Sequence, residues 1–335
     1  MEPIFMIGTR RSGSNLLRIM LNQLDDVASP HPPHIFERIQ PLIETYGDLE
    51  TPENFNRLVD DVCELIKLNP VVWENVKINR EDILSRCKKN NLSEIYMAAY
   101  SIYAESHNAT KWCCKSLDNI FHADIIEENF DNPKYIYLYR DGRDVGLSTQ
   151  KVIIGEKHIY NIAKEWADTQ KQAIDLKKKV NPDRLFFVSY EDLTGKSEET
   201  TKNLCEFLGV DYDESMMDFH KGDEAKSSAK SSHLWNNLTK PIMKNNSKKF
   251  QKEMPEDEIR IFESVAGHVL DELGYDRYLV KKGEEIIFSP KDIESFNAIN
   301  NSKKHAFNQQ LDKEDLDRRE RQLALIDRIK SRCHA

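Results

Sequence analysis

The stretch IFMIGTRRSGSNLLRIML, residues 4–21, gives the strongest indication of the fold. Its first four residues form an uninterrupted apolar run that ends at Gly8, as expected of a strand buried on both faces. From Ser14 onward the apolar residues recur at helical spacing, which predicts a helix beginning there. The chain therefore opens with a strand, a glycine-containing loop and a helix.

The same alternation of strands and helices continues along the chain. Short apolar runs at residues 111–115 and 185–188 predict buried strands, and YIYLY at residues 135–139 is the clearest strand because it is continuous and β-prone. Amphipathic helices are predicted over residues 54–69, 92–106, 160–179 and 200–208. This order predicts an α/β fold in which a P-loop-like, mainly parallel central sheet is flanked by helices.

The end of the chain differs in composition from the rest. Beyond Pro290 the sequence is polar and rich in charge, and residues 312–332 carry mixed charges typical of a solvated helix. We therefore expect one domain over residues 1–280 and a polar, largely helical C-terminal extension over residues 281–335. The extension would be a peripheral helix or a contact in a homo-oligomer.

Composition excludes several classes of protein. A formal net charge of −9 argues against a nucleic-acid partner, which would require a basic face. No apolar run approaches the roughly 20 residues of a membrane helix, and the N-terminus lacks the basic start and long apolar core of a signal peptide. We therefore expect a cytoplasmic protein with no membrane partner. The cysteines and histidines show no ligand-like spacing, so no metal is expected.

The loop GTRRSGSN, residues 8–15, nearly matches the nucleotide-binding pattern GxxxxGK[ST]. The glycines have the correct spacing, but Ser14 replaces the lysine that contacts phosphates and Asn15 replaces the residue that holds magnesium. The loop retains backbone N–H groups and a helix N-terminus that favour an anion, and Arg10 and Arg11 add positive charge. The alternative is a solvated connection with no ligand.

RSGSN, residues 11–15, after an apolar strand and before LLRIML, resembles the 5′-phosphosulfate loop of sulfotransferases that use 3′-phosphoadenosine-5′-phosphosulfate (PAPS). The likeness is to soluble, bacterial-type members, whose loop has the pattern [KR][ST]G[ST][ST]. It implies that Arg11 contacts the bridging oxygen of the leaving phosphate, and Asn15 departs from the usual serine or threonine. The donor-binding residues implied here are Arg10, Arg11, Ser12, Gly13, Ser14 and Asn15.

A second motif, YLYRDGRDVGLS at residues 137–148, strengthens this resemblance. In the family, an arginine that ends a strand and a serine eight positions later bind the 3′-phosphate of the donor, and Arg140 and Ser148 occupy these positions. A guanidinium can bind phosphate through two hydrogen bonds, and open α/β sheets bind ligands at the carboxyl ends of their strands. The alternative is a surface ion pair between Arg140 and Asp144.

Weaker matches to the family follow in the same order along the chain. Residues 190–193 and 205–209 resemble its YEDL and FLG segments, and residues 228–242 correspond to a late loop over the nucleotide. The resemblance covers roughly residues 4–275.

Sulfuryl transfer resembles phosphoryl transfer, for which catalysis is mainly positioning and electrostatics. The resemblance implies that Arg11 stabilises the leaving phosphate and that Lys115, after a buried strand, orients the sulfuryl oxygens. The base is expected in HPPHIFE, residues 31–37. Glu37 resembles the glutamate of the tyrosylprotein and carbohydrate branches, and His34 suits base chemistry near neutral pH. We favour Glu37, with His34 as the alternative.

The sequence thus predicts transfer of a sulfuryl group from PAPS to a hydroxyl of a small-molecule or saccharide acceptor, without metal. The product of the donor would be 3′-phosphoadenosine-5′-phosphate (PAP). Two alternatives are a divergent P-loop nucleotide kinase, which would require magnesium, and a nucleotide-binding protein without transfer activity. The sequence does not choose the acceptor.

Overall fold

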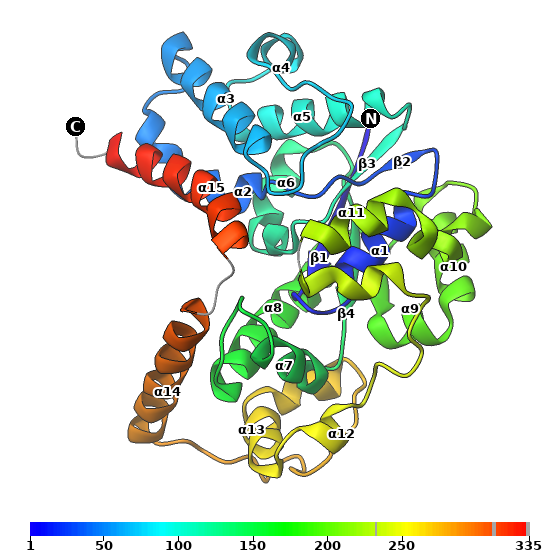
Figure 1. Ribbon diagram of the computed structural model, residues 1–335, viewed down its shortest axis with the longest axis vertical. Helices are drawn as coiled ribbons and strands as arrows, with labels where there is room; N and C mark the ends of the chain where they lie inside the picture. The colour runs from blue at the N-terminus through cyan, green and yellow to red at the C-terminus, as the bar shows by residue number, and fades with distance from the viewer. Residues whose placement is uncertain (232, 310–312, 333–335) are drawn as a thin grey trace.

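The computed structural model describes residues 1–231, 233–309 and 313–332. Five parallel strands form its central sheet, in the order β2-β3-β1-β4-β5 (Figure 1). The strands are β1 Glu2–Gly8, β2 Val27–Ala28, β3 Lys111–Cys114, β4 Lys134–Tyr139 and β5 Leu185–Ser189. The four predicted strands are confirmed to within two residues at each end. The two-residue β2 was not predicted, because so short a segment has no periodicity.

Helices surround the sheet on both faces (Figure 1). They are α1 Ser14–Leu21, α2 Ile35–Ile39, α3 Pro52–Lys67, α4 Arg80–Arg86, α5 Leu92–Ser106, α6 Ala123–Asn129, α7 Gly142–Gln150, α8 Ile159–Lys179, α9 Tyr190–Gly195, α10 Ser197–Leu208, α11 Asp223–Ser231, α12 Phe250–Glu253, α13 Glu256–Glu272, α14 Pro290–Asn308 and α15 Lys313–Ser331. Short 3-10 segments include η1 Gln40–Tyr46, η2 Leu117–His122, η4 Glu214–Lys221 and η5 His233–Thr239. The predicted α/β fold is confirmed. Residue 312, the first of the last predicted helix, lies outside the described residues.

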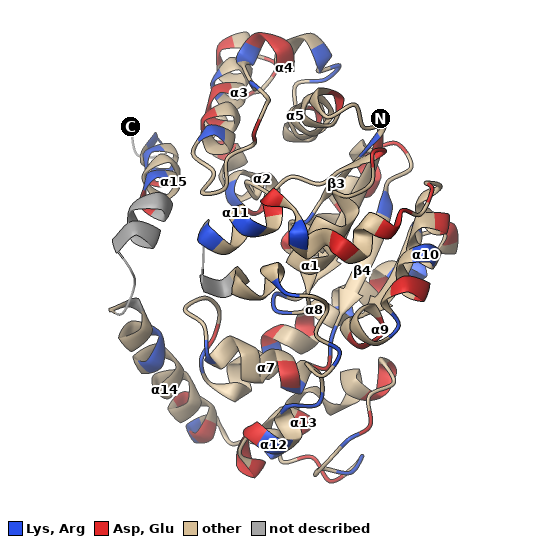
Figure 2. Ribbon diagram, turned by 45° about the vertical axis from the view of Figure 1, so that its right-hand side comes forward, with Lys and Arg blue, Asp and Glu red and all other residues tan. Residues whose placement is uncertain are grey.

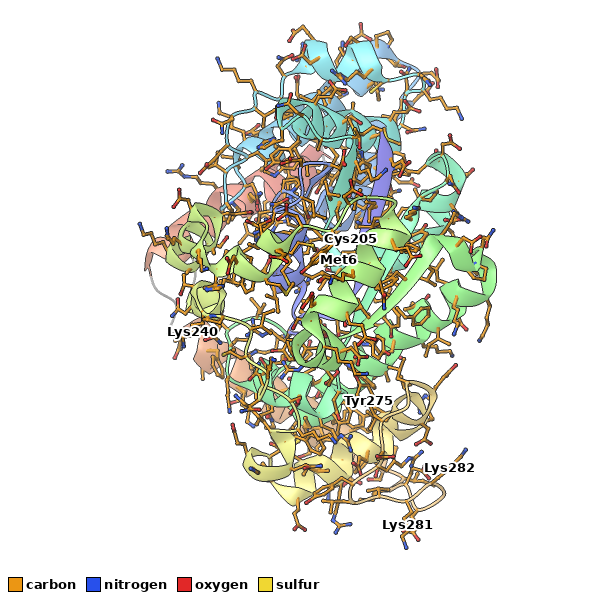
Figure 3. All side chains as sticks on the ribbon, turned by 90° about the vertical axis from the view of Figure 1, so that its right-hand side faces the viewer. Met6, Cys205, Lys240, Tyr275, Lys281 and Lys282 are labelled. Atoms are coloured by element: carbon orange, nitrogen blue, oxygen red, sulfur yellow. The ribbon has the colours of Figure 1, made fainter. Side chains whose placement is uncertain are left out.

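Alternate residues of the central strands supply two separate hydrophobic cores. Phe5 and Ile7 of β1 pack with α3, α5, α6 and α8, whereas Ile4 and Met6 pack on the opposite face with α1, α9 and α10. Figure 3 shows Met6 and Cys205 within this second cluster. Since successive side chains of a strand point to opposite faces, a parallel sheet covered on both sides needs the continuous apolar strands seen in this sequence.

A buried ion network fixes the loop that follows β4. The Arg143 guanidinium donates to Asp141 at 2.9 and 2.7 Å and to Glu263 of α13 at 2.5 Å. Glu263 also accepts hydrogen bonds from the backbone N–H groups of residues 278–280. All three charged side chains are buried. Within the RDGRD sequence, residues 140–144, Asp141 and Arg143 thus have a structural role: they anchor the loop that carries Arg140.

Helix α13 was not predicted, although three acidic residues in its first turn, Glu256, Asp257 and Glu258, are a recognisable N-terminal signal. It packs against α7 and α8 and forms the third hydrophobic cluster.

The C-terminal helices α14 and α15 run along one side of the molecule, in orange and red in Figure 1. Helix α14 packs on α8, and α15 packs on α3 and η1. Leu325 and Ile329 of α15 are buried in the main core, so this helix is not solvated on all sides. The division at residue 280 stays a prediction.

Charges of both signs are mixed over the outer helices, as on α10 and α13 (Figure 2). Lys281 and Lys282 project outward at one end of the molecule (Figure 3). Within the described part of the chain, no helix combines the length and apolar character needed to span a membrane.

Candidate functional site

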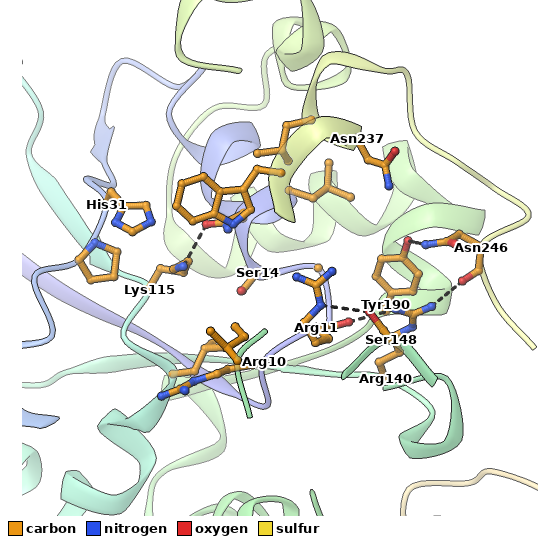
Figure 4. A pocket seen from close by; sticks show the side chains of 18 of the residues that line it. Arg10, Arg11, Ser14, His31, Lys115, Arg140, Ser148, Tyr190, Asn237 and Asn246 are labelled. Carbon is orange, nitrogen blue, oxygen red and sulfur yellow. Dashed lines mark hydrogen bonds between the residues drawn. The ribbon is translucent and has the colours of Figure 1, made fainter. Parts of the chain in front are cut away.

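A cavity of about 490 Å³ lies at the carboxyl ends of β1, β3 and β4. This is the edge at which open parallel sheets bind ligands. Four segments supply its predicted residues. The loop after β1 carries Arg10 and Arg11, the segment after β2 carries His34 and Glu37, the loop after β3 carries Lys115, and the segment after β4 carries Arg140 and Ser148. The structure therefore brings together residues that are far apart in the sequence (Figure 4).

Two glycines allow the phosphate loop its shape. A Cβ on Gly8 would lie 2.1 Å from the carbonyl oxygen of Leu138, and one on Gly13 would lie 2.6 Å from the Tyr190 ring. Both residues have positive φ angles, 140° and 92°, which glycine adopts at little cost. Gly13 is the N-cap of α1, so the loop delivers the chain to a free helix N-terminus at the cavity.

The predicted loop residues do not all face the cavity. Arg10, Arg11, Gly13, Ser14 and Asn15 line it. The Ser12 hydroxyl instead lies 3.0 Å from the Thr9 hydroxyl and is fully buried. The Ser12 side chain therefore shapes the loop rather than the cavity wall.

Two arginines and a serine form one end of the cavity (Figure 4). Arg11 Nε donates to the Ser148 hydroxyl at 3.0 Å, and Arg140 donates to the carbonyl oxygens of Arg11 at 3.0 Å and Asn246 at 2.6 Å. The Arg140 guanidinium also lies 4.3 Å from the centre of the Tyr190 ring. Burial and the charge of Arg140 lower the pKa of Arg11. Two like charges at one place, one of them buried and the other half-buried, favour an anionic ligand.

The ion pair of the alternative interpretation exists, but not at the surface. Arg140 and Asp144 are 3.8 Å apart and only 6% and 2% exposed. Asp144 also accepts a hydrogen bond from the Phe250 backbone at 3.0 Å. Asp144 therefore lies beside Arg140, and both residues line the cavity.

Lys115 is buried, and its Nζ donates to Asn15 Oδ1 at 3.0 Å. This contact gives Asn15, the departure from the family pattern, a physical role: its amide oxygen holds the lysine. Burial, with the charges of Arg18 and Arg10, lowers the pKa of Lys115 to about 7.

Glu37 is engaged in ion pairs rather than free to act as a base. Its carboxylate accepts from Arg10 at 3.1 Å and lies 2.9 Å from His34 Nδ1. Burial alone would raise the pKa of Glu37, but the contacts with His34 and Arg10 outweigh it and hold that pKa at about 2. His34 Nδ1 also lies 2.9 Å from the Ser116 hydroxyl. The two predicted bases, Glu37 and His34, are therefore paired with each other.

His31, which the sequence analysis did not select, is placed differently. It lines the cavity, and both of its ring nitrogens are buried without a hydrogen-bond partner among the described residues. Its backbone carbonyl accepts from Asn69 and from the Trp73 indole, each at 2.8 Å, which fixes the residue. Burial, and then the charge of Lys115, lowers the pKa of His31 well below its usual value. The imidazole is therefore neutral at pH 7. The sequence signal that could have identified His31 is its position in the HPPHIFE segment, residues 31–37, where the base was expected.

The late loop contributes Trp235, Asn237 and Leu238 to the cavity. The Trp235 ring lies 4.9 Å from the His31 ring between centroids. Ser232, within the same predicted loop, lies outside the described residues.

His34, Glu37 and Asp118 each offer a ligand atom within 4.8 Å of the others, a spacing that could hold a metal ion. Arg10, however, donates to both carboxylates, at 3.1 and 2.9 Å. A guanidinium thus already supplies positive charge to this cluster.

A family model described as "Sulfotransferase family" matches residues 3–214, more than half of the chain. This chain belongs to the sulfotransferase family. The family resemblance seen in the sequence is thereby confirmed. Two curated relatives are similar over most of this sulfotransferase chain. A protein-tyrosine sulfotransferase of Drosophila melanogaster is 21% identical, with 83% of this chain and 52% of the relative covered. Protein-tyrosine sulfotransferase A of Caenorhabditis elegans is 24% identical, with 82% and 67% covered.

The chain thus spans about half of the first relative and two thirds of the second.

Solved structures share the fold. The sulfotransferase domain of the Synechococcus PCC 7002 olefin synthase superposes with a TM-score of 0.54 at 22% identity, covering 82% of this chain and 95% of that one. The sulfotransferase domain of the curacin biosynthetic pathway gives 0.55 at 19% identity, covering 83% and 99%.

Proposed function

We propose that this sulfotransferase transfers the sulfuryl group of PAPS to a hydroxyl of a small-molecule or saccharide acceptor and releases PAP. The observation that carries the proposal is a pair of arginines, the half-buried Arg11 and the buried Arg140, at one end of a cavity whose other end holds Lys115 and His31 (Figure 4). The end with the two arginines suits an anionic donor. The neutral imidazole at the other end suits the deprotonation of an acceptor hydroxyl.

The donor would lie along the phosphate loop. The backbone N–H groups at the start of α1 and the Arg11 guanidinium would hold the 5′-phosphosulfate. Arg140 and Ser148 would hold the 3′-phosphate. Arg140 now donates to two carbonyl oxygens, and a phosphate would offer it stronger, charge-assisted hydrogen bonds.

Transfer would proceed in line. The acceptor hydroxyl loses its proton to His31 as its oxygen bonds to sulfur, and the bond from sulfur to the phosphate oxygen breaks. The electron pair leaves with PAP, where Arg11 stabilises the new charge. Lys115, positioned by Asn15, would orient the sulfuryl oxygens.

We propose His31 as the base because its ring nitrogens have no hydrogen-bond partner in the described part of the chain, whereas Glu37 is held by Arg10 and His34. The roles predicted for Glu37 and His34 stay alternatives. A tyrosine hydroxyl is the second candidate acceptor, because both curated relatives are named protein-tyrosine sulfotransferases. The metal-free reaction, the cytoplasmic location and homo-oligomer formation stay predictions.

Thermal unfolding with PAP and no added metal tests the donor site. Ligand at one hundred times its dissociation constant should add about 2.7 kcal/mol of stability. The rise should be largely lost in Arg11→Ala and Arg140→Ala. A magnesium-dependent rise with ATP, and none with PAP, would instead support the kinase. PAP binding without turnover on any acceptor would support the non-catalytic alternative.

A further inference from the structure

The C-terminal helix α15 supplies part of the cavity wall, although it lies at the other end of the chain from the phosphate loop. Gln322 lines the cavity, and only 1% of its surface is exposed. Its Nε2 donates to the carbonyl oxygen of Leu65 at 3.0 Å, near the end of α3. The chain then continues into residues 69–71, which line the cavity with His31. Gln322 therefore lies at the same end of the cavity as His31, which we call the acceptor end.

Contacts with the main core and with α3 hold α15 in place. Leu325 and Ile329, which follow Gln322 at helical spacing, are buried in the main core. Arg332 donates to the buried carboxylate of Asp61 on α3 at 2.5 and 3.1 Å. Because the Asp61 carboxylate is buried, loss of Arg332 would leave that charge with less compensation, so this contact ties the end of α15 to α3.

Helix α14 holds another part of the cavity. The buried Asn300 accepts through Oδ1 from the backbone N–H groups of Lys157 and His158, at 2.7 and 2.9 Å. These bonds fix the loop after α7, which contributes Lys151 and Ile154 to the lining. Helix α14 packs on α8, and α15 packs on α3 (Figure 1). The extension therefore secures two walls of one cavity.

We propose that Gln322 is a specificity-determining residue, which closes the acceptor end of the cavity and limits the length of acceptor that can reach His31. The inference rests on the proposed function. The amide cannot swing away without leaving a buried hydrogen-bonding group unpaired. The cavity of about 490 Å³ must also hold the donor, so the acceptor space suits a compact phenol or alcohol better than a tyrosine within a peptide.

Three single variants test this role. Gln322→Ala lengthens the acceptor space and Gln322→Trp shortens it. Leu323→Ala is the matched control, since Leu323 is the next residue of α15 and is 57% exposed. Each protein is assayed with PAPS and a mixture of 4-alkylphenols from methyl to hexyl, together with a tyrosine-containing pentapeptide. The sulfated products are then measured by mass spectrometry.

Gln322→Ala should raise kcat/KM for hexylphenol relative to methylphenol by about tenfold, and Gln322→Trp should lower it by a similar factor. The control should keep the ratio of the unaltered protein. An unchanged ratio in both Gln322 variants, with the stabilisation by PAP intact, would overturn the inference. Failure of the unaltered protein to bind PAP or to sulfate any compound would instead refute the proposed function.

Discussion

Replacing His31 by glutamine tests whether His31, rather than Glu37, is the catalytic base. The variant keeps a polar side chain of similar size but cannot accept the acceptor proton. General-base catalysis contributes about 10²–10⁴-fold, so kcat/KM should fall by that factor, or roughly 3–5 kcal/mol of transition-state stabilisation. Glu37→Gln should cost less than about tenfold, because the Glu37 carboxylate already accepts from Arg10 and lies beside His34.

The assay is sulfation of a phenol by PAPS as a function of pH. Since burial depresses the pKa of His31 in the folded protein, its imidazole is lost as a base only when the pH falls below the usual histidine range. The acid limb should therefore be present in the unaltered protein and absent in His31→Gln. Stabilisation by PAP should be retained in both variants. A larger loss in Glu37→Gln than in His31→Gln would refute the assignment and favour Glu37.

Three further variants test the site and its support. Because burial lowers the pKa of Lys115, the unfolded chain binds more protons than the folded one between about pH 7 and the ordinary lysine value, so stability without ligand should rise with pH there. Lys115→Met should flatten that rise in urea unfolding curves, and an unchanged slope would contradict the burial argument. Gly8→Ala should lower the free energy of unfolding by at least about 2 kcal/mol, since its Cβ would collide with Leu138 at a positive φ. Arg143→Met should cost about 3–5 kcal/mol in the same assay, because it leaves Asp141 and Glu263 buried without their partner. A loss below about 1 kcal/mol would show that this network is not structural.

The sequence predicted the strands well for a physical reason. Strands covered on both faces must be apolar throughout, so β1 and β4 carry a strong local signal. Helix α13 could have been recognised from its acidic first turn. The two-residue β2 could not, because its pairing with β3 depends on tertiary contacts rather than on its own composition.

The candidate site was predictable only where spacing along the chain implies position in space. Arg11, Lys115 and Arg140 each follow a predicted strand, and the carboxyl ends of parallel strands share one edge of the sheet. The choice among His31, His34 and Glu37 depends on which side chains pair with one another, and adjacent residues of one loop give no sign of this. The contribution of Gln322 depends on how a distant helix packs, which the sequence of that helix does not specify.

The most direct test of the account is transfer itself. The purified protein is incubated with PAPS and a phenolic acceptor in the presence of a chelator, and PAP and the acceptor are followed by mass spectrometry. We predict that PAP and an acceptor carrying one added SO₃ group appear in equal amounts, and that Arg11→Ala abolishes both. Transfer of a phosphoryl group from ATP with magnesium, and no product from PAPS, would contradict the account.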